Sequence, residues 1–100
     1  MKELIWKFDV PIIDASHKGV VRVDLPQSSE VLSCGAVGDR LFIWAKFLSD
    51  SRDLDFVPRY FEVFGTGHEI TNDMGIERKF IGTAFMHGGS LVWHVFERLD

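Results

Sequence analysis

Apolar and polar residues alternate one by one over most of this chain, and no other feature constrains its fold as strongly. Near the N-terminus, Leu4, Trp6, Phe8 and Val10 occupy every second position. Side chains at every second position point to the same face of a β-strand. The same period recurs near residues 19–25, 31–37, 59–64, 78–86 and 90–99. Residues 40–48 are apolar at nearly every position, as expected for a central strand covered on both faces. Because β-branched and aromatic residues fill these segments and no window keeps a helical apolar stripe, the sequence predicts an all-β protein.

Turn residues separate these segments. The two-residue connection Gly38-Asp39 fits a tight primed turn and predicts a hairpin of residues 31–37 and 40–48. A second hairpin is expected around His87, Gly88 and Gly89, and one turn of helix can fit between residues 49 and 56. With the apolar faces of the two hairpins packed together, we expect a compact antiparallel sandwich or a partly open barrel of about seven short strands.

Length and cysteine content indicate one domain that needs no covalent support. A chain of 100 residues with 46% hydrophobic content can bury a core, so we expect a single all-β domain over residues 1–100. Cys34 is the only cysteine and excludes an intramolecular disulfide. Charges interrupt the first residues, and no apolar run approaches the roughly 18 residues of a membrane helix. These features argue against secretion and membrane insertion and favour the cytoplasm.

Charge and aromatic content bear on the class of partner. The net charge is −4, and the eleven Lys and Arg residues are scattered along the chain. Sequence-independent binding to nucleic-acid backbones needs clustered cations, so the pattern argues against direct nucleic-acid binding. Aromatic residues make up 13% of the chain, and we expect most of them, including the three Trp, in the core. Any that are exposed would mark an oligomer or partner surface.

The segment of residues 60–70 contains the candidate binding residues. An aromatic strand there leads into Gly65, Thr66, Gly67 and His68, and we add His94 from the last strand as a further candidate. Glycines allow positive φ angles and leave amides uncovered, so this loop can act as an anion-binding nest. The plainer alternative is a turn that redirects the chain. A third glycine with a following helix is missing, which excludes a dinucleotide fingerprint, and the Lys of a P-loop is absent.

The sequence offers no catalytic or metal-binding constellation. His68, His87 and His94 lie in the last third of the chain, but their spacing matches no compact zinc motif. Cys34 alternates with apolar neighbours, as expected for an inert buried thiol. We therefore expect no catalytic residues, no metal, no cofactor and no enzymatic activity.

Several segments resemble a family of short phage and prophage proteins of unknown function. The resemblance is carried by residues 60–70, by residues 80–83 and by the C-terminal Leu-Val-Trp-His-Val-Phe-Glu at 91–97, with residues 31–33 and 41–45 resembling the central hairpin of that family. The match is loose at residues 50–58. The resemblance implies a small β-rich protein made in an infected or lysogenic bacterial cell. It supplies no catalytic residue set.

These observations favour a non-enzymatic phage accessory protein that acts by binding, with a host defence or metabolic protein as the expected partner. One alternative is a small-ligand protein that binds a nucleotide or another anion through the loop 65–68. A further alternative is a minor virion component, which would form homo-oligomers through sheet edges or exposed aromatics.

Overall fold

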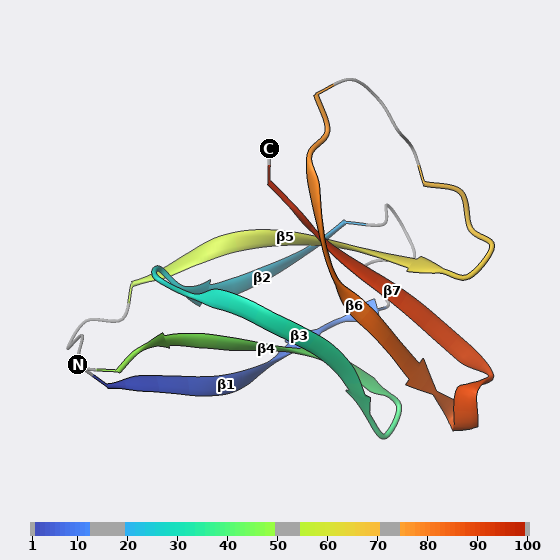
Figure 1. Cartoon of the computed structure of the whole chain (residues 1–100), viewed down its shortest axis with the longest axis horizontal. Helices are drawn as coiled ribbons and strands as arrows, with labels where there is room; N and C mark the ends of the chain where they lie inside the picture. The colour runs from blue at the N-terminus through green and yellow to red at the C-terminus, as the bar shows by residue number, and fades with distance from the viewer. Residues whose placement is uncertain (1, 13–19, 50–54, 71–74, 100) are drawn as a thin grey trace.

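Seven β-strands form the body of the computed structural model, which describes residues 2–12, 20–49, 55–70 and 75–99 (Figure 1). Their bounds follow the alternation of the sequence closely, and two of the expected segments, at residues 40–48 and 78–86, are reproduced residue for residue. In chain order, the strands are β1 (Glu3–Val10), β2 (Val20–Pro26), β3 (Glu30–Val37), β4 (Arg40–Leu48), β5 (Phe56–Gly65), β6 (Arg78–Met86) and β7 (Leu91–Arg98).

The strands form two antiparallel sheets. One sheet has three strands in the order β1-β4-β3, and the other has four in the order β2-β5-β7-β6. The two sheets do not join into a closed barrel, so the prediction of an all-β antiparallel sandwich is confirmed. No helix among the described residues has the length and apolar character needed to cross a bilayer.

Both expected hairpins are present. In the first, Val37 pairs with Arg40, and Gly38 has φ 64° at the first central position of the turn, where a glycine is preferred. In the second, a short 3₁₀ turn (His87–Gly89) joins β6 to β7. The three residues of that turn all have positive φ angles, which reverses the chain between the two strands.

The fifth strand begins earlier than the sequence predicts. We expected it to start at Arg59, after a polar segment that ends at Pro58. The strand starts at Phe56, and Pro58 pairs with Asp24 of β2. The neighbouring strand β7 pairs with β5 only from Tyr60 onward, so Pro58 lies where β5 still has one open edge. The helical turn expected between residues 49 and 56 falls mainly outside the described residues.

The core lies between the two sheets and contains one face of each strand. One face of β2 lies in this core, and both hairpins contribute side chains to the same buried cluster. The buried cluster consists of Val10, Val21, Val23, Leu25, Val31, Leu41, Ile43, Phe61, Val63, Ala84, Met86 and Val95.

Among the described residues, cations and not another layer of chain cover the Phe42 ring on the outer face of β4. We expected β4 to be buried on both faces because nearly all its residues are apolar. Phe42 is indeed 8% exposed, but the Lys7 ammonium lies 4.4 Å from the centre of its ring, with the Arg40 guanidinium at 5.5 Å. The expectation that Trp6 is a core residue is wrong, since 45% of it is exposed.

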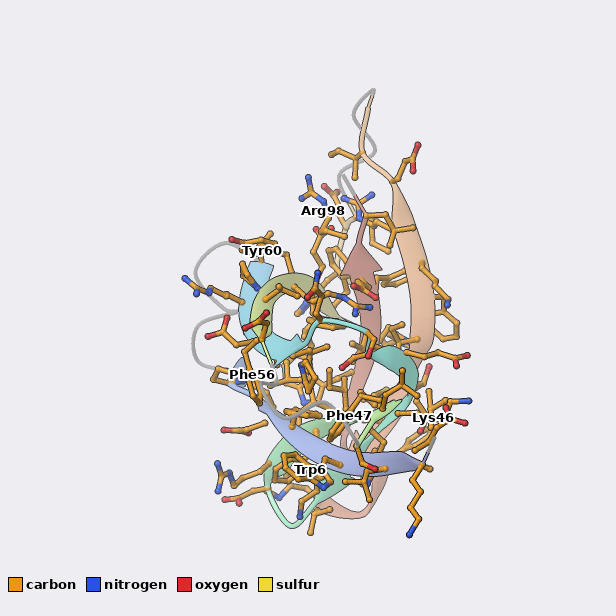
Figure 2. All side chains as sticks on the ribbon, turned by 90° about the vertical axis from the view of Figure 1, so that its left-hand side faces the viewer. Trp6, Lys46, Phe47, Phe56, Tyr60 and Arg98 are labelled. Carbon is orange, nitrogen blue, oxygen red and sulfur yellow. The ribbon has the colours of Figure 1, made fainter. Side chains whose placement is uncertain are left out.

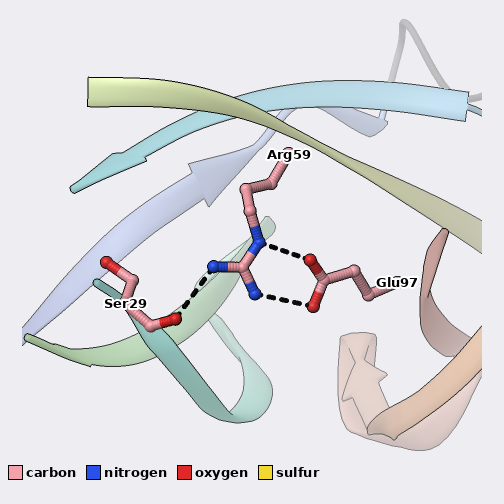
Figure 3. A network of polar contacts seen from close by, with 3 residues as sticks. All are labelled: Ser29, Arg59 and Glu97. Carbon is pink, nitrogen blue, oxygen red and sulfur yellow. Dashed lines mark hydrogen bonds and ion pairs between the residues drawn. The ribbon is translucent and has the colours of Figure 1, made fainter. Parts of the chain in front are cut away.

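An ion pair within the four-stranded sheet reaches the turn where the chain crosses to the other sheet (Figure 3). Arg59 of β5 donates from both Nε and Nη2 to the carboxylate of Glu97 on β7. Its third nitrogen, Nη1, donates to the Ser29 carbonyl at 2.9 Å. Ser29 lies in the turn between β2 and β3, where the chain passes from one sheet to the other. The guanidinium therefore ties this crossover to β5 and β7.

Candidate functional site

The loop that follows β5 is a closed turn. The His68 amide donates to the Gly65 carbonyl at 3.0 Å, and Gly67 has φ 88°, as a type II turn requires at its third position. The imidazole folds back, and its Nδ1 accepts from the Gly65 amide at 3.2 Å. Because this amide already has a partner, it does not contribute to an anion-binding nest.

Close approach explains the glycine at position 65. Gly65 is not among the glycines with positive φ, contrary to our expectation for both loop glycines. A Cβ atom on Gly65 would lie 2.8 Å from Cε1 of His68, closer than real Cβ contacts. The small residue therefore makes room for the imidazole, and the conformational freedom is needed only at Gly67.

His94 lies beside this loop, between two hydroxyl groups. Its Nε2 is 2.8 Å from Oγ1 of Thr66, and its Nδ1 is 3.1 Å from Oγ1 of Thr83. The structure thus brings together two of the predicted candidates, Thr66 and His94. It adds Thr83, which pairs with His94 across the β6–β7 hairpin and could have been found by counting the register outward from residues 87–89.

The two hydroxyls hold the His94 ring in place and do not select one of its two neutral tautomers. A threonine hydroxyl can donate or accept a hydrogen bond, so either tautomer of the neutral ring is compatible with both contacts. Neither ring nitrogen contacts a carboxylate in these hydrogen bonds. The arrangement therefore orients the His94 ring on the sheet and does not build the carboxylate–histidine pair of a general-base site.

His94 belongs to a larger surface, the outer face of the four-stranded sheet, which we call the aromatic face. Residues opposite one another in the register form rows across β5, β7 and β6. The first row is rich in arginine, the second and third in aromatic residues, and the fourth continues the apolar surface toward the β6–β7 hairpin. The rows are Tyr60, Arg98 and Arg78, then Glu62, Phe96 and Phe80, then Phe64, His94 and Thr83, and finally Val92 and Phe85.

Glu62 is buried on this face although no layer of chain covers it within the described residues. It is 5% exposed, because two arginines, one from β7 and one from β6, lie against it. The Nε of Arg78 donates to Oε1 of Glu62 at 2.7 Å, and the Nε of Arg98 lies 3.5 Å from the same oxygen. Arg78 also lies 5.8 Å from the Phe64 ring centre. This network fixes the arginine row against the sheet.

Three of the four phenylalanines of the aromatic face form a chain of ring contacts. Phe96 is the central ring, 5.2 Å from Phe80 and 5.8 Å from Phe64 between centroids. The surface continues outward to side chains that remain open to solvent, since Phe80 is 55% and Phe85 63% exposed. Figure 2 shows Tyr60 and Arg98 in one region, well separated from Trp6 and Phe47. A contiguous exposed aromatic surface of this kind is typical of a site where a partner binds.

A shallow pocket of about 200 Å³ opens where the turn meets the β6–β7 hairpin. The indole nitrogen of Trp93, one of its lining residues, is buried and has no hydrogen-bond partner among the described residues. Within the same described part of the chain, no group of three or more His, Cys, Asp or Glu is placed to hold a metal ion. The pocket is lined by Gly65, Thr66, His68, Ser90, Leu91, Val92 and Trp93.

The thiol of Cys34 is half-buried between the sheets. Gly82 of β6 lies close to it, since a Cβ atom on Gly82 would be 3.1 Å from the Cys34 sulfur. Burial disfavours the thiolate and raises the pKa of Cys34 from 9.0 to about 11. Only about one molecule in a thousand would carry the thiolate at pH 8, so we expect slow labelling by a thiol reagent.

The labelling rate of Cys34 should rise about tenfold per pH unit until the pH approaches its pKa, because the thiolate is the reactive form. The unfolded chain in urea should label rapidly at pH 8 and serves as the control. The thiol ionises with a pKa of 9.0 in the unfolded chain and of about 11 in the folded protein. The free energy of unfolding should therefore decrease as the pH rises from 9.0 to about 11, because only the unfolded chain loses the proton readily there. Equal native and unfolded labelling rates at pH 8 would contradict the burial of this thiol.

The fold and the site together define a two-sheet β-sandwich protein with an exposed aromatic sheet face. Residues 1–100, the whole chain, match the family model described as Domain of unknown function (DUF7352), and the chain belongs to that family. None of the curated proteins and none of the solved structures matches it.

Proposed function

We propose that this chain is a non-enzymatic accessory protein of a phage or prophage, which binds a host protein in the bacterial cytoplasm through its aromatic face. The observation that carries the proposal is the exposure of Phe80 and Phe85 on one face of the sheet, where Phe80 packs against the Phe96 ring. Large aromatic side chains supply most of the binding energy in many protein interfaces, together with arginine. Both residue types are present here, in adjacent rows of one rigid sheet.

The charges of this face also suit a protein partner. Glu62 is already paired with Arg78 and lies near Arg98. When a partner excludes water from this face, the carboxylate of Glu62 therefore keeps a positively charged partner. The aromatic side chains of this face stand on paired strands, so the backbone beneath them loses little conformational entropy on binding. A partner therefore meets a preformed surface.

We expect the double variant F80S/F85S to lose its partner. The matched control is L32S/V37S, which removes two exposed apolar side chains, 42% and 50% exposed, from β3 in the other sheet. Tagged wild type and the two variants are used to capture proteins from host extract. Loss of the same captured protein with F80S/F85S and its retention with L32S/V37S would support the proposal. Equal capture by all three would contradict binding through the aromatic face.

A second candidate is binding of a small ligand in the pocket beside the turn 65–68. The unpartnered indole nitrogen of Trp93 favours it, whereas the Ser90 hydroxyl already donates to the His87 carbonyl. The closed turn counts against the anion-nest version of this candidate, because His68 already occupies the Gly65 amide. Titration of the purified wild type with a nucleotide, followed by tryptophan fluorescence, separates the two. Saturable nucleotide binding without any captured protein would favour the pocket over the aromatic face.

A further inference from the structure

Strand β1 is an edge strand with regular geometry. It pairs with β4 in unbroken register from Glu3 opposite Leu48 to Val10 opposite Leu41, and its other edge is not paired within the described chain. In Figure 1, β1 lies below β4 on the left of the view. The edge strands β3 and β6 each contain a register shift, and the fourth edge strand, β2, carries two charges and ends at Pro26. An unbulged edge presents a row of backbone donors and acceptors on which another strand can form.

The first half of β1 is apolar on both faces. Leu4, Ile5 and Trp6 are 41%, 57% and 45% exposed. Trp6 covers Phe47 of β4 with an edge-to-face contact of 5.0 Å, and the two residues lie together in Figure 2. Natural edge strands usually resist pairing through charges, prolines or bulges, and this stretch of three apolar residues contains none of them.

The flanking charges select one way of pairing β1 with a second copy of itself. In an antiparallel pair with Ile5 opposite Ile5, Glu3 lies opposite Lys7 of the second copy, and symmetry repeats this pair. Leu4 then lies opposite Trp6 of the second copy on the other face. Opposite charges in cross-strand positions stabilise a sheet, and so do aromatic pairs with apolar residues.

Neighbouring registers lack this complementarity. Centring the pair on Trp6 places Glu3 opposite Asp9, so that like charges face each other twice. Centring it on Leu4 places Glu3 opposite Ile5 and separates Glu3 from Lys7. A shift by one residue would place the inward-facing residues of one copy opposite the outward-facing residues of the other, so the faces of the two sheets would no longer match. The Ile5-centred register is thus the one in which both charges are paired.

We propose that the β1 edge joins two copies of this chain into a continuous six-stranded sheet, with Ile5 on the two-fold axis. Glu3 already contacts Lys46 of β4 at 3.3 Å, and a carboxylate can accept from a second cation as well. Lys7 lies over Phe42 on the same outer face and can extend along the sheet toward Glu3 of the second copy. This association uses a different sheet from the aromatic face and does not depend on the proposed function.

Cysteine cross-linking tests the register. Cross-strand residues directly opposite each other have Cα atoms about 4.5–5.5 Å apart, which permits a disulfide. The variant Ile5→Cys should therefore form a covalent dimer on mild oxidation. The matched control, Leu4→Cys, is also exposed, but in this register the two positions are about 7–8 Å apart on the diagonal and cannot be bridged. The wild type, which contains only the buried Cys34, should stay uncross-linked.

We expect Ile5→Cys to cross-link about tenfold faster than Leu4→Cys, because only its sulfur atoms can meet without backbone movement. Sedimentation velocity of the wild type should show a monomer–dimer equilibrium that Lys7→Glu shifts to monomer, with an unchanged circular dichroism spectrum. A wild type that remains monomeric at every concentration, or equal cross-linking of the two cysteine variants, would overturn the proposal.

Discussion

Replacing Glu97 by Ala is expected to destabilise the fold by about 3 kcal/mol, because Arg59 then keeps its buried charge without its counter-ion. Glu97 is 4% exposed, and its partner's side chain is 23% exposed, so water can only partly replace the lost carboxylate. Without Glu97, the Arg59 guanidinium is also less firmly held where it donates to the Ser29 carbonyl at the crossover between the sheets. Urea unfolding followed by circular dichroism at pH 7 measures the change.

Two variants distinguish a lost partner from lost packing at this ion pair. The double variant R59M/E97L removes both charges and keeps apolar volume, and we expect it to recover most of the stability that Glu97→Ala loses. Asp24→Ala breaks the exposed pair with Arg22 and should leave the unfolding midpoint nearly unchanged. If Glu97→Ala unfolded at the same urea concentration as the wild type, the structural role of the Arg59 contact would be wrong.

Replacing Phe61 by Ala should cost about 3–5 kcal/mol, since the change leaves a cavity between the sheets that the neighbours cannot fill. Phe61 is 0% exposed and lies in β5, between Val21 of β2 and Glu97 of β7. Domains of this size have only about 5–15 kcal/mol of stability in total. Thermal and urea unfolding should both show a large decrease, and the variant should be close to unfolded at physiological temperature.

The control for Phe61 is Phe85→Ala. The side chain of Phe85 is 63% exposed on the aromatic face, so its removal should change stability by less than about 0.5 kcal/mol. Similar losses for the two phenylalanines would mean that Phe85 belongs to the core. That result would contradict both the assignment of faces and the proposed binding surface.

The sequence predicts the strands well because alternation and turn residues are local signals. The bounds of β4 and β6 and both hairpins follow from them. The start of β5 was predicted incorrectly because the acceptability of Pro58 depends on where β7 stops pairing, which is a long-range property.

The choice of face was the hardest part of the site to predict. In β7, Val92, His94 and Phe96 alternate with Trp93 and Val95, so both faces read as apolar. Alternation therefore finds the strand without telling which face meets the other sheet. Burial of Glu62 depends on Arg78, 16 residues away, and burial of Glu97 depends on Arg59, 38 residues away. No local sequence pattern predicts either pair.

The candidate loop shows the same limit. Its glycines predict a turn, and the structure has one. The position of the His68 ring over Gly65, and the contact of Thr66 with His94, depend on the pairing of β5 with β7. The sequence therefore identifies the residues that meet at this corner of the aromatic face and does not predict their hydrogen bonds.

Hydroxyl-radical footprinting of the complex with the captured host protein tests binding through the aromatic face most directly. In the free protein, Phe80 and Phe85 should be strongly oxidised, as should the apolar side chains of Val37 and Leu99, all four being at least 50% exposed. In the complex, we predict that oxidation of Phe80 and Phe85 falls several-fold while that of Val37 is unchanged. Unaltered oxidation of Phe80 and Phe85 in a saturated complex would contradict the proposal.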